Sequence, residues 1–313
     1  MPSTPANGIT LEYQTFGDPN ARPLLLLRGL GTQMIQWDPA LCARIAEAGH
    51  FLVIFDNRDV GLSTHFPEAA PPSIAQILEA RQGGALPSVP YTLADMAGDV
   101  IGLMDALGLE SAHIAGISMG GMIVQQTALQ FPGRVRSMTS IMSSTSDPAL
   151  PGPTPEAQAA LVEPAPSERE AYLEYSVRTG RAFTGKGLGE GFAYDAEKQR
   201  ALAGRVYDRA FDPDGIARQM GAVMASGSRA EALAGLTVPS LVIHGADDPL
   251  IPLAAGQATA DAIPGAKMVV VEGMGHDLPP GAWPPIVEAL SAHTEAHTAA
   301  HTEAHSEAHD RPR

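Results

Sequence analysis

Residues 112–131 read AHIAGISMGGMIVQQTALQF, and the segment GISMGG at 116–121 within this stretch decides the fold. The unbroken apolar run before the segment is typical of a strand buried on both faces. Residues 119–130 after it are predicted to form a helix that Pro132 ends. A serine between two glycines at such a junction is the pattern of a nucleophile elbow, a tight turn that lifts the Ser118 hydroxyl above the sheet.

Short apolar runs elsewhere in the chain predict further strands of the same kind, at residues 23–27, 51–55, 239–245 and 267–273. Helical patterns separate them. Thr92, for example, is predicted to cap a helix whose apolar positions continue at helical spacing to Leu107. This alternation predicts an α/β fold with a mostly parallel central sheet flanked by helices.

The stretch from residue 147 to residue 230 breaks this alternation. It begins DPALPGPTPE, which is too rich in proline for a strand, and then has the pattern of short helices. We interpret it as a helical cap inserted before the last strands, over the carboxyl ends where open α/β sheets bind ligands. The predicted organisation is a first core part at 1–146, the cap at 147–230, a second core part at 231–291 and a tail at 292–313.

The tail is a low-complexity segment with a histidine at every fourth position: His293, His297, His301, His305 and His309. On a helix these side chains form one stripe, and imidazoles one turn apart can chelate zinc or nickel, so a metal-binding module is one interpretation. We favour a solvated extension of the last helix. Deletion beyond Ala292 is then expected to leave activity intact.

Composition excludes several classes of protein. The chain has 313 residues, with 35 acidic against 20 basic side chains and a formal net charge of −15, which argues against nucleic acid as the main partner. The single cysteine, Cys42, excludes an internal disulfide and a multi-cysteine metal site. The first residues lack the pattern of a signal peptide, and no apolar run approaches the roughly 20 residues that span a membrane. We therefore expect a cytoplasmic protein without a membrane partner.

A serine hydroxyl is a weak nucleophile, so the elbow predicts a base and an orienting acid further along the chain. Asp247 and Asp248 follow one predicted strand, and His276 follows the next. Side chains at three strand ends can meet above a parallel sheet. The alternative is a loop or capping acid and a surface histidine. His244, at the end of a strand, is expected to be a packed residue rather than the base.

With these residues the chain resembles the serine hydrolases of the α/β-hydrolase superfamily, over roughly residues 8 to 291. The matching segments are RGLGTQMIQW (28–37), DNRDVGLS (56–63), GISMGGM (116–122), VIHGADDPLIP (242–252) and GMGH (273–276). The resemblance implies that Ser118, His276 and Asp248 form the catalytic triad, with Asp247 as second choice for the acid. It also implies an oxyanion hole made by the backbone N–H groups of Leu30 and Met119, and no metal or organic cofactor.

Two positions depart from the usual family pattern. Arg28 stands where most relatives have histidine, and Asp59 replaces a glycine in a turn that we interpret as structural. The amide role of Leu30 does not depend on the residue at position 28. Trp37 and Met122 are candidates for the substrate pocket, with ordinary core packing as the alternative. For Met142 we favour core packing.

The resemblance extends to bacterial carboxylesterases, including methyl esterases and macrolide esterases. We expect a carboxylic-ester hydrolase that acts on a small-molecule, largely apolar ester, such as a lactone or a polyketide or macrolide ester, through an acyl-enzyme. Hydrolysis of a carbon–carbon bond or a thioester uses the same residues and is an alternative. A different class of function is a non-catalytic small-molecule receptor on the same scaffold.

Overall fold

The computed structural model describes residues 1–73, 76, 79, 87–187 and 190–298. These residues form an eight-stranded sheet in the order β1-β2-β4-β3-β5-β6-β7-β8. The first two strands are antiparallel to their neighbours, and the strands from β4 to β8 are parallel. The strands are β1 Ser3–Ala6, β2 Ile9–Phe16, β3 Arg22–Leu27, β4 His50–Phe55, β5 Ala112–Ile117, β6 Val135–Ile141, β7 Ser240–Gly245 and β8 Lys267–Val271.

The predicted α/β fold and its five apolar strands are confirmed, but burial differs at one edge. β8 ends the sheet, so Val270 remains 40% exposed although its strand has the sequence of a fully buried one. β1, β2 and β6 were not predicted. The sequence of β6, VRSMTSI, carries polar residues that are nonetheless buried, because Ser137 bonds the His113 ring at 2.8 Å and Ser140 accepts from Gln125 at 3.1 Å.

Alternate residues of the central strands fill two hydrophobic clusters, one on each face of the sheet. Leu25 and Val53 belong to the cluster that includes residues of α3 (Leu93–Ala106) and α4 (Met119–Gln130). Their neighbours along the strands lie in the opposite cluster, with residues of α1 (Pro39–Glu47) and α11 (Trp283–Ala296). The unbroken apolar runs are therefore explained by helices covering both faces.

The helix predicted after Thr92 is α3, and its start follows from local chemistry. The Thr92 side chain and Asp95 form a capping box, which satisfies backbone N–H groups that the first helical turn leaves unpaired. The helix is followed by Gly108 with a φ of +68°, a conformation that glycine adopts without steric cost. In the described part of the chain, no helix is both long and apolar enough to cross a membrane.

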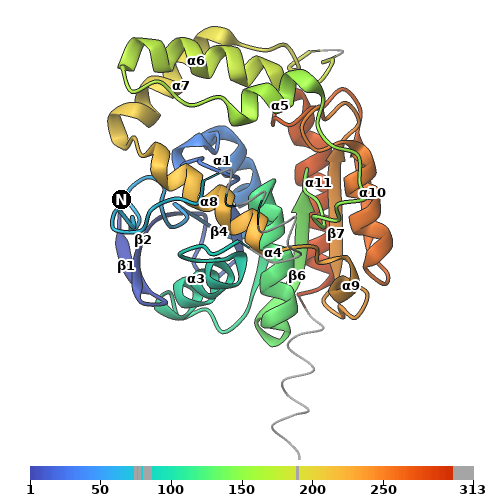
Figure 1. The fold of residues 1–313 in the computed structure, drawn as a ribbon. Coiled ribbons are helices and arrows are strands. Elements are labelled where there is room, and N and C mark those ends of the chain that lie inside the picture. The colour runs from blue at the N-terminus through green and yellow to red at the C-terminus, as the bar shows by residue number, and fades with distance from the viewer. Residues whose placement is uncertain (74–75, 77–78, 80–86, 188–189, 299–313) are drawn as a thin grey trace, which may run out of the picture.

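Five helices lie between β6 and β7 in the described part of the chain, and the first four are α5 Pro155–Val162, α6 Arg169–Ala182, α7 Ala196–Arg209 and α8 Pro213–Ala225. In Figure 1, α5, α6 and α7 lie together above the core, and α8 runs from them down across it. The short helix α9 (Ala230–Leu233) then leads to β7. Gln219 and Ala222 of α8 are fully buried, so α8 packs into the core.

The first histidine of the tail does not lie in solvent. His293 is 5% exposed in the last turn of α11, and the next residue, Thr294, lies 2.7 Å from the buried His50 ring through its hydroxyl. The expectation of a solvated extension is therefore wrong for His293, because α11 packs against the sheet to its end. His297 contacts the His293 ring at a centroid distance of 4.9 Å. His301, His305 and His309 lie outside the described residues.

Two truncations test where the packed chain ends. A protein ending at Thr298 keeps the His50–Thr294 contact, whereas one ending at Ala292 loses it together with buried His293. Lost burial and a lost buried hydrogen bond are together worth about 2–3 kcal/mol. We expect the chain ending at Ala292 to melt about 5 °C or more below the full chain. The chain ending at Thr298 should melt at the same temperature as the full chain. Equal melting temperatures for both truncations would contradict this assignment.

Candidate active site

Ser118 connects β5 to α4 with a backbone conformation that side chains rarely adopt, at φ 54° and ψ −122°. Such a conformation costs about 1–3 kcal/mol and persists only where the surroundings enforce it. A Cβ on Gly116 would lie 2.2 Å from the Gly120 carbonyl oxygen, and one on Gly120 would lie 2.4 Å from the Leu27 oxygen. Both glycines are therefore required by close backbone contact, which holds Ser118 at the carboxyl end of the sheet.

His276 and Asp248 meet beyond the ends of β8 and β7. The Nδ1 atom of His276 lies 2.8 Å from Oδ2 of Asp248, whose carboxylate is fully buried. The other carboxylate oxygen accepts the backbone N–H groups of Leu250 and Ile251 at 2.9 and 2.8 Å. A carboxylate fixed in this way assigns the ring proton to Nδ1 and leaves Nε2 of His276 as the basic nitrogen.

Asp247 and Asp248 have different partners in the structure, and so do His244 and His276. The Asp247 carboxylate lies 3.2 Å from the Lys186 ammonium group rather than against His276. His244 is fully buried with Nε2 2.8 Å from the Ile251 carbonyl oxygen, and burial lowers the pKa of its ring. Asp248 is therefore the carboxylate that faces His276, and His244 is the packed strand-end residue that its position predicts.

Ser118 and His276 line one cavity of about 390 Å³. Among the described residues no hydrogen bond joins their side chains, and such bonds commonly tighten only when substrate is bound. The wall combines core residues with residues of the helices above, and most of it is apolar. Its apolar members include Leu30, Ile35, Trp37, Ile117, Met142, Leu161, Phe183, Leu202, Leu250 and Leu278.

The loop after β3 lies directly against the elbow, since a Cβ on Gly29 would be 3.0 Å from the Cβ of Ser118. Leu30 follows and lines the cavity, and Met119 begins α4 immediately after the serine. The side chain of Gln219 on α8 holds this loop, accepting the Gly31 N–H at 2.8 Å through Oε1. Nothing in the sequence pattern indicated that a helix of the insertion fixes the loop.

Of the two pocket residues predicted from sequence, only one lines the cavity. Trp37 lines the cavity, but Met122 does not, because it lies a turn along α4 and packs against the cluster that includes α3. Met142, for which core packing is favoured from sequence, is buried as expected but also lines the cavity at the end of β6. Phe183 and Leu202 come from the inserted helices, where no motif marks them.

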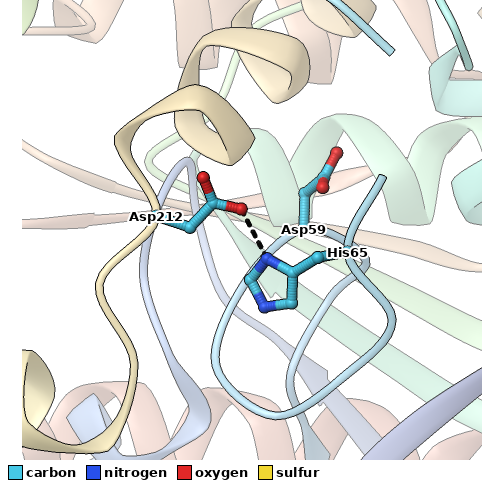
Figure 2. Close-up of side chains that lie close together, drawn as sticks. All are labelled: Asp59, His65 and Asp212. Atoms are coloured by element: carbon cyan, nitrogen blue, oxygen red, sulfur yellow. Dashed lines mark hydrogen bonds and ion pairs between the residues drawn. The ribbon is translucent and has the colours of Figure 1, made fainter. Parts of the chain in front are cut away.

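A second cluster, of side chains that could bind a metal ion, does not line the cavity of Ser118 and His276. Asp59, His65 and Asp212 lie close enough to share a metal ion, and Figure 2 shows the His65 ring pointing at Asp212, with 2.6 Å between Nδ1 and Oδ2. Arg218 already binds both carboxylate oxygens of Asp59, at 2.8 and 2.9 Å. The Tyr91 hydroxyl donates to the same carboxylate at 2.6 Å. Because the Arg218 guanidinium already occupies the carboxylate that a metal ion would bind, we assign this cluster a structural role rather than metal binding.

Arg218 explains the aspartate that replaces the usual glycine of the turn. Asp59 has a φ of 64°, where glycine is favoured, and its carboxylate is held by an arginine that is 2% exposed. Because Arg218 belongs to α8 and Asp59 to the turn after β4, the pair fastens the inserted helices to the core. Arg209 at the end of α7 makes a similar contact, 2.6 Å from the buried Asp56 carboxylate.

Comparison with known proteins gives the same family as the fold. Residues 22–279 match the family model described as alpha/beta hydrolase fold, and the chain belongs to that family. It is 31% identical over 306 residues to rhodomycin D methylesterase DauP of Streptomyces sp. (strain C5), covering 91% of this chain and 95% of that protein. Rhodomycin D methylesterase DnrP of Streptomyces peucetius is 29% identical, with the same coverage of both chains.

Solved structures agree in fold. The meta-cleavage product hydrolase CumD of Pseudomonas fluorescens IP01 aligns with a TM-score of 0.70 over 95% of this chain and 98% of that chain, at 21% sequence identity. At this identity the likeness shows the fold alone. Together with the esterase relatives, the family membership identifies the chain as a carboxylic-ester hydrolase, in agreement with the expectation from sequence.

The Asp59–Arg218 pair predicts a distinctive pattern of stabilities. Arg218→Met leaves a buried carboxylate without its cation, which costs about 3–5 kcal/mol, and Asp59→Gly in the same chain should recover much of that loss. The matched control is Arg169→Met, which breaks the exposed pair with Asp208 and should leave the melting temperature nearly unchanged. Calorimetric melting measures all of these variants. A double variant no more stable than Arg218→Met, or a melting temperature that falls with a chelator, would contradict the assignment.

Asp277 predicts a dependence of stability on pH. It lines the cavity, and burial raises the pKa of its carboxyl from 3.8 to about 6. Because the folded-state pKa lies above the unfolded value, the carboxyl destabilises the fold increasingly as pH rises from about 4 through 6. We expect Asp277→Asn to stabilise the protein by about 1–3 kcal/mol at neutral pH and by roughly half as much near pH 5. Melting curves at several pH values test this, and a gain independent of pH would refute it.

Proposed function

We propose that Ser118, His276 and Asp248 act as nucleophile, base and orienting acid in the hydrolysis of a carboxylic ester through an acyl-enzyme. The contact between His276 Nδ1 and the buried Asp248 carboxylate, 2.8 Å long, carries this proposal, because it leaves a basic Nε2 in the cavity that Ser118 lines. The forced backbone conformation of Ser118 supports it. Backbone strain of this kind is concentrated at functional sites.

In the first half of the reaction the Ser118 oxygen attacks the ester carbonyl carbon while its proton passes to His276 Nε2. The carbonyl oxygen becomes negative and accepts the N–H groups of Leu30 and Met119, each worth about 2.7–4 kcal/mol in the transition state. The bond to the alcohol oxygen then breaks. The alcohol leaves with the proton from His276, and the acid half stays bound to Ser118.

In the second half a water molecule takes the place of the alcohol. His276 Nε2 removes its proton as the water oxygen attacks the acyl carbon, and the same two amides receive the charge. The bond to Ser118 breaks, and His276 returns the proton to the serine oxygen. The buried Asp248 stabilises the charged imidazole in both halves without itself taking the proton.

The proposed substrate is a methyl ester of a bulky, mostly apolar acid. The cavity volume of about 390 Å³ lies in the range of small-molecule sites, and its wall is predominantly apolar. The two relatives named as methylesterases support a small alcohol as the leaving group. The polyketide or macrolide esters expected from the sequence fall in the same class of bulky, apolar acyl groups.

Matched substitutions test the triad. On nitrophenyl esters of graded acyl length we expect Ser118→Ala to fall to background and Asp248→Asn to lose about 10⁴-fold in kcat, because asparagine favours the wrong ring tautomer. Asp247→Asn, one residue away and bonded to Lys186, should stay within a few-fold of the parent. Circular dichroism of each variant establishes that the fold is intact.

Two outcomes would overturn the proposal. Activity that persists in Ser118→Ala excludes this residue as the nucleophile, and equal losses in the two aspartate variants remove the special role of Asp248. A folded parent protein that binds these esters and the corresponding methyl esters without turning them over would instead support the receptor interpretation.

A further inference from the structure

Arg28 is a half-buried cation on the cavity wall that the proposed mechanism does not use. It follows β3 directly and precedes Gly29, which lies against Ser118. Its side chain lines the same cavity as Ser118 and His276. The guanidinium carbon lies 4.8 Å from the centre of the Trp37 ring, so an aromatic face holds the charge in position.

Other arginines with little exposure in the described chain have protein acceptors, and Arg28 has none. Arg229 donates to the Gln125 side chain at 3.0 Å and to the Ser144 carbonyl oxygen at 2.9 Å, and others bind carboxylates. Arg58, Arg209 and Arg218 lie 2.6, 2.6 and 2.8 Å from Asp99, Asp56 and Asp59. No described residue accepts a hydrogen bond from the Arg28 guanidinium, and its Nε is buried. Burial lowers its pKa to about 10, which still leaves it charged at neutral pH.

Trp37 adds a second donor to the same wall. Its indole N–H is also buried and has no acceptor among the described residues. Buried donors of this kind are unfavourable unless an acceptor is supplied, and a buried charge is more so. The acidic side chains around the cavity are poor candidates, since Asp38 binds the Lys198 ammonium at 2.7 Å and Asp195 caps α7.

We propose that Arg28, supported by the Trp37 indole, is a specificity-determining residue that binds a carboxylate on the acid half of the ester substrate. The inference rests on the proposed function, because it places a second recognition group beside Ser118. A planar guanidinium with its donors in a fork matches a carboxylate in a bidentate manner. The neutral part of the acyl group then lies along the apolar wall.

The net charge of −15 does not oppose this assignment. A monoanion responds most strongly to the charges nearest to it, and the Arg28 guanidinium lies on the cavity wall. Asp277 lies on the same wall, and with its pKa raised by burial to about 6 it is largely ionised at neutral pH. Recognition of a carboxylate therefore rests on the unpaired guanidinium of Arg28 rather than on the net charge of the wall.

The first test compares paired substrates. Nitrophenyl half-esters of glutaric, adipic and suberic acid carry a terminal carboxylate, and nitrophenyl esters of the matching monoacids do not. We expect the parent protein to favour the half-ester in kcat/KM at one chain length, and Arg28→Gln to reduce that preference about 10-fold or more. Arg205→Gln, an arginine on the rim of the same cavity, should leave the preference unchanged.

Arg28→Lys keeps the charge and loses the fork, so it should recover only part of the preference. Equal losses on both substrates of a pair would show that Arg28 merely supports the loop, and a parent without any preference would exclude a carboxylate site.

A binding measurement separates this inference from the triad. Calorimetry with monomethyl suberate and monomethyl adipate on Ser118→Ala needs no chemical step, and the added Arg28→Gln change should weaken binding about 10-fold. Unchanged binding would overturn the role of Arg28 whatever Ser118 does. Weakened binding together with an active Ser118→Ala would instead sustain Arg28 and reject the proposed nucleophile.

Discussion

The contact between the nucleophile turn and its neighbouring strands is the constraint on which the rest of the structure depends. Gly120 packs so closely on the end of β3 that a methyl group would lie 2.4 Å from the Leu27 oxygen, and Gly116 is equally crowded by Gly120. This packing forces Ser118 into a positive φ and fixes it beside the loop of Arg28 and Leu30. The strain is local, and the burial of hydrophobic clusters on both faces of the sheet offsets it.

The inserted helices are part of the site as well as its cover. Arg218 and Gln219 on α8 are buried, and they bind the turn after β4 and the loop that carries Leu30. Arg209 makes a third buried connection to Asp56. Because these contacts are charged or doubly hydrogen-bonded, α8 is firmly fixed to the core. The loop that carries Leu30 and the wall of the cavity therefore depend on a segment that lies outside the family motifs.

The chemistry of the site could be predicted from sequence further than its shape could. GISMGG, DDP and GMGH mark strand ends whose convergence is dictated by a parallel sheet, so Ser118, Asp248 and His276 could be named and their order understood. Position after the strand does not by itself distinguish Asp248 from Asp247, and it was the family resemblance that put Asp248 first. Polar β6 and alternating β2 lacked the apolar run used to find strands. The pocket wall depends on tertiary packing of α6 and α7, which carries no local signal.

The central claim is that the Ser118 oxygen becomes covalently bonded to the acyl group. The most direct measurement is mass spectrometry of the protein after reaction with a fluorophosphonate, which traps an activated serine. We predict one phosphonyl group per chain, located on the peptide that contains Ser118, and much slower labelling when His276 is replaced by alanine. Labelling at another residue, or none in a protein that still hydrolyses esters, would contradict the account.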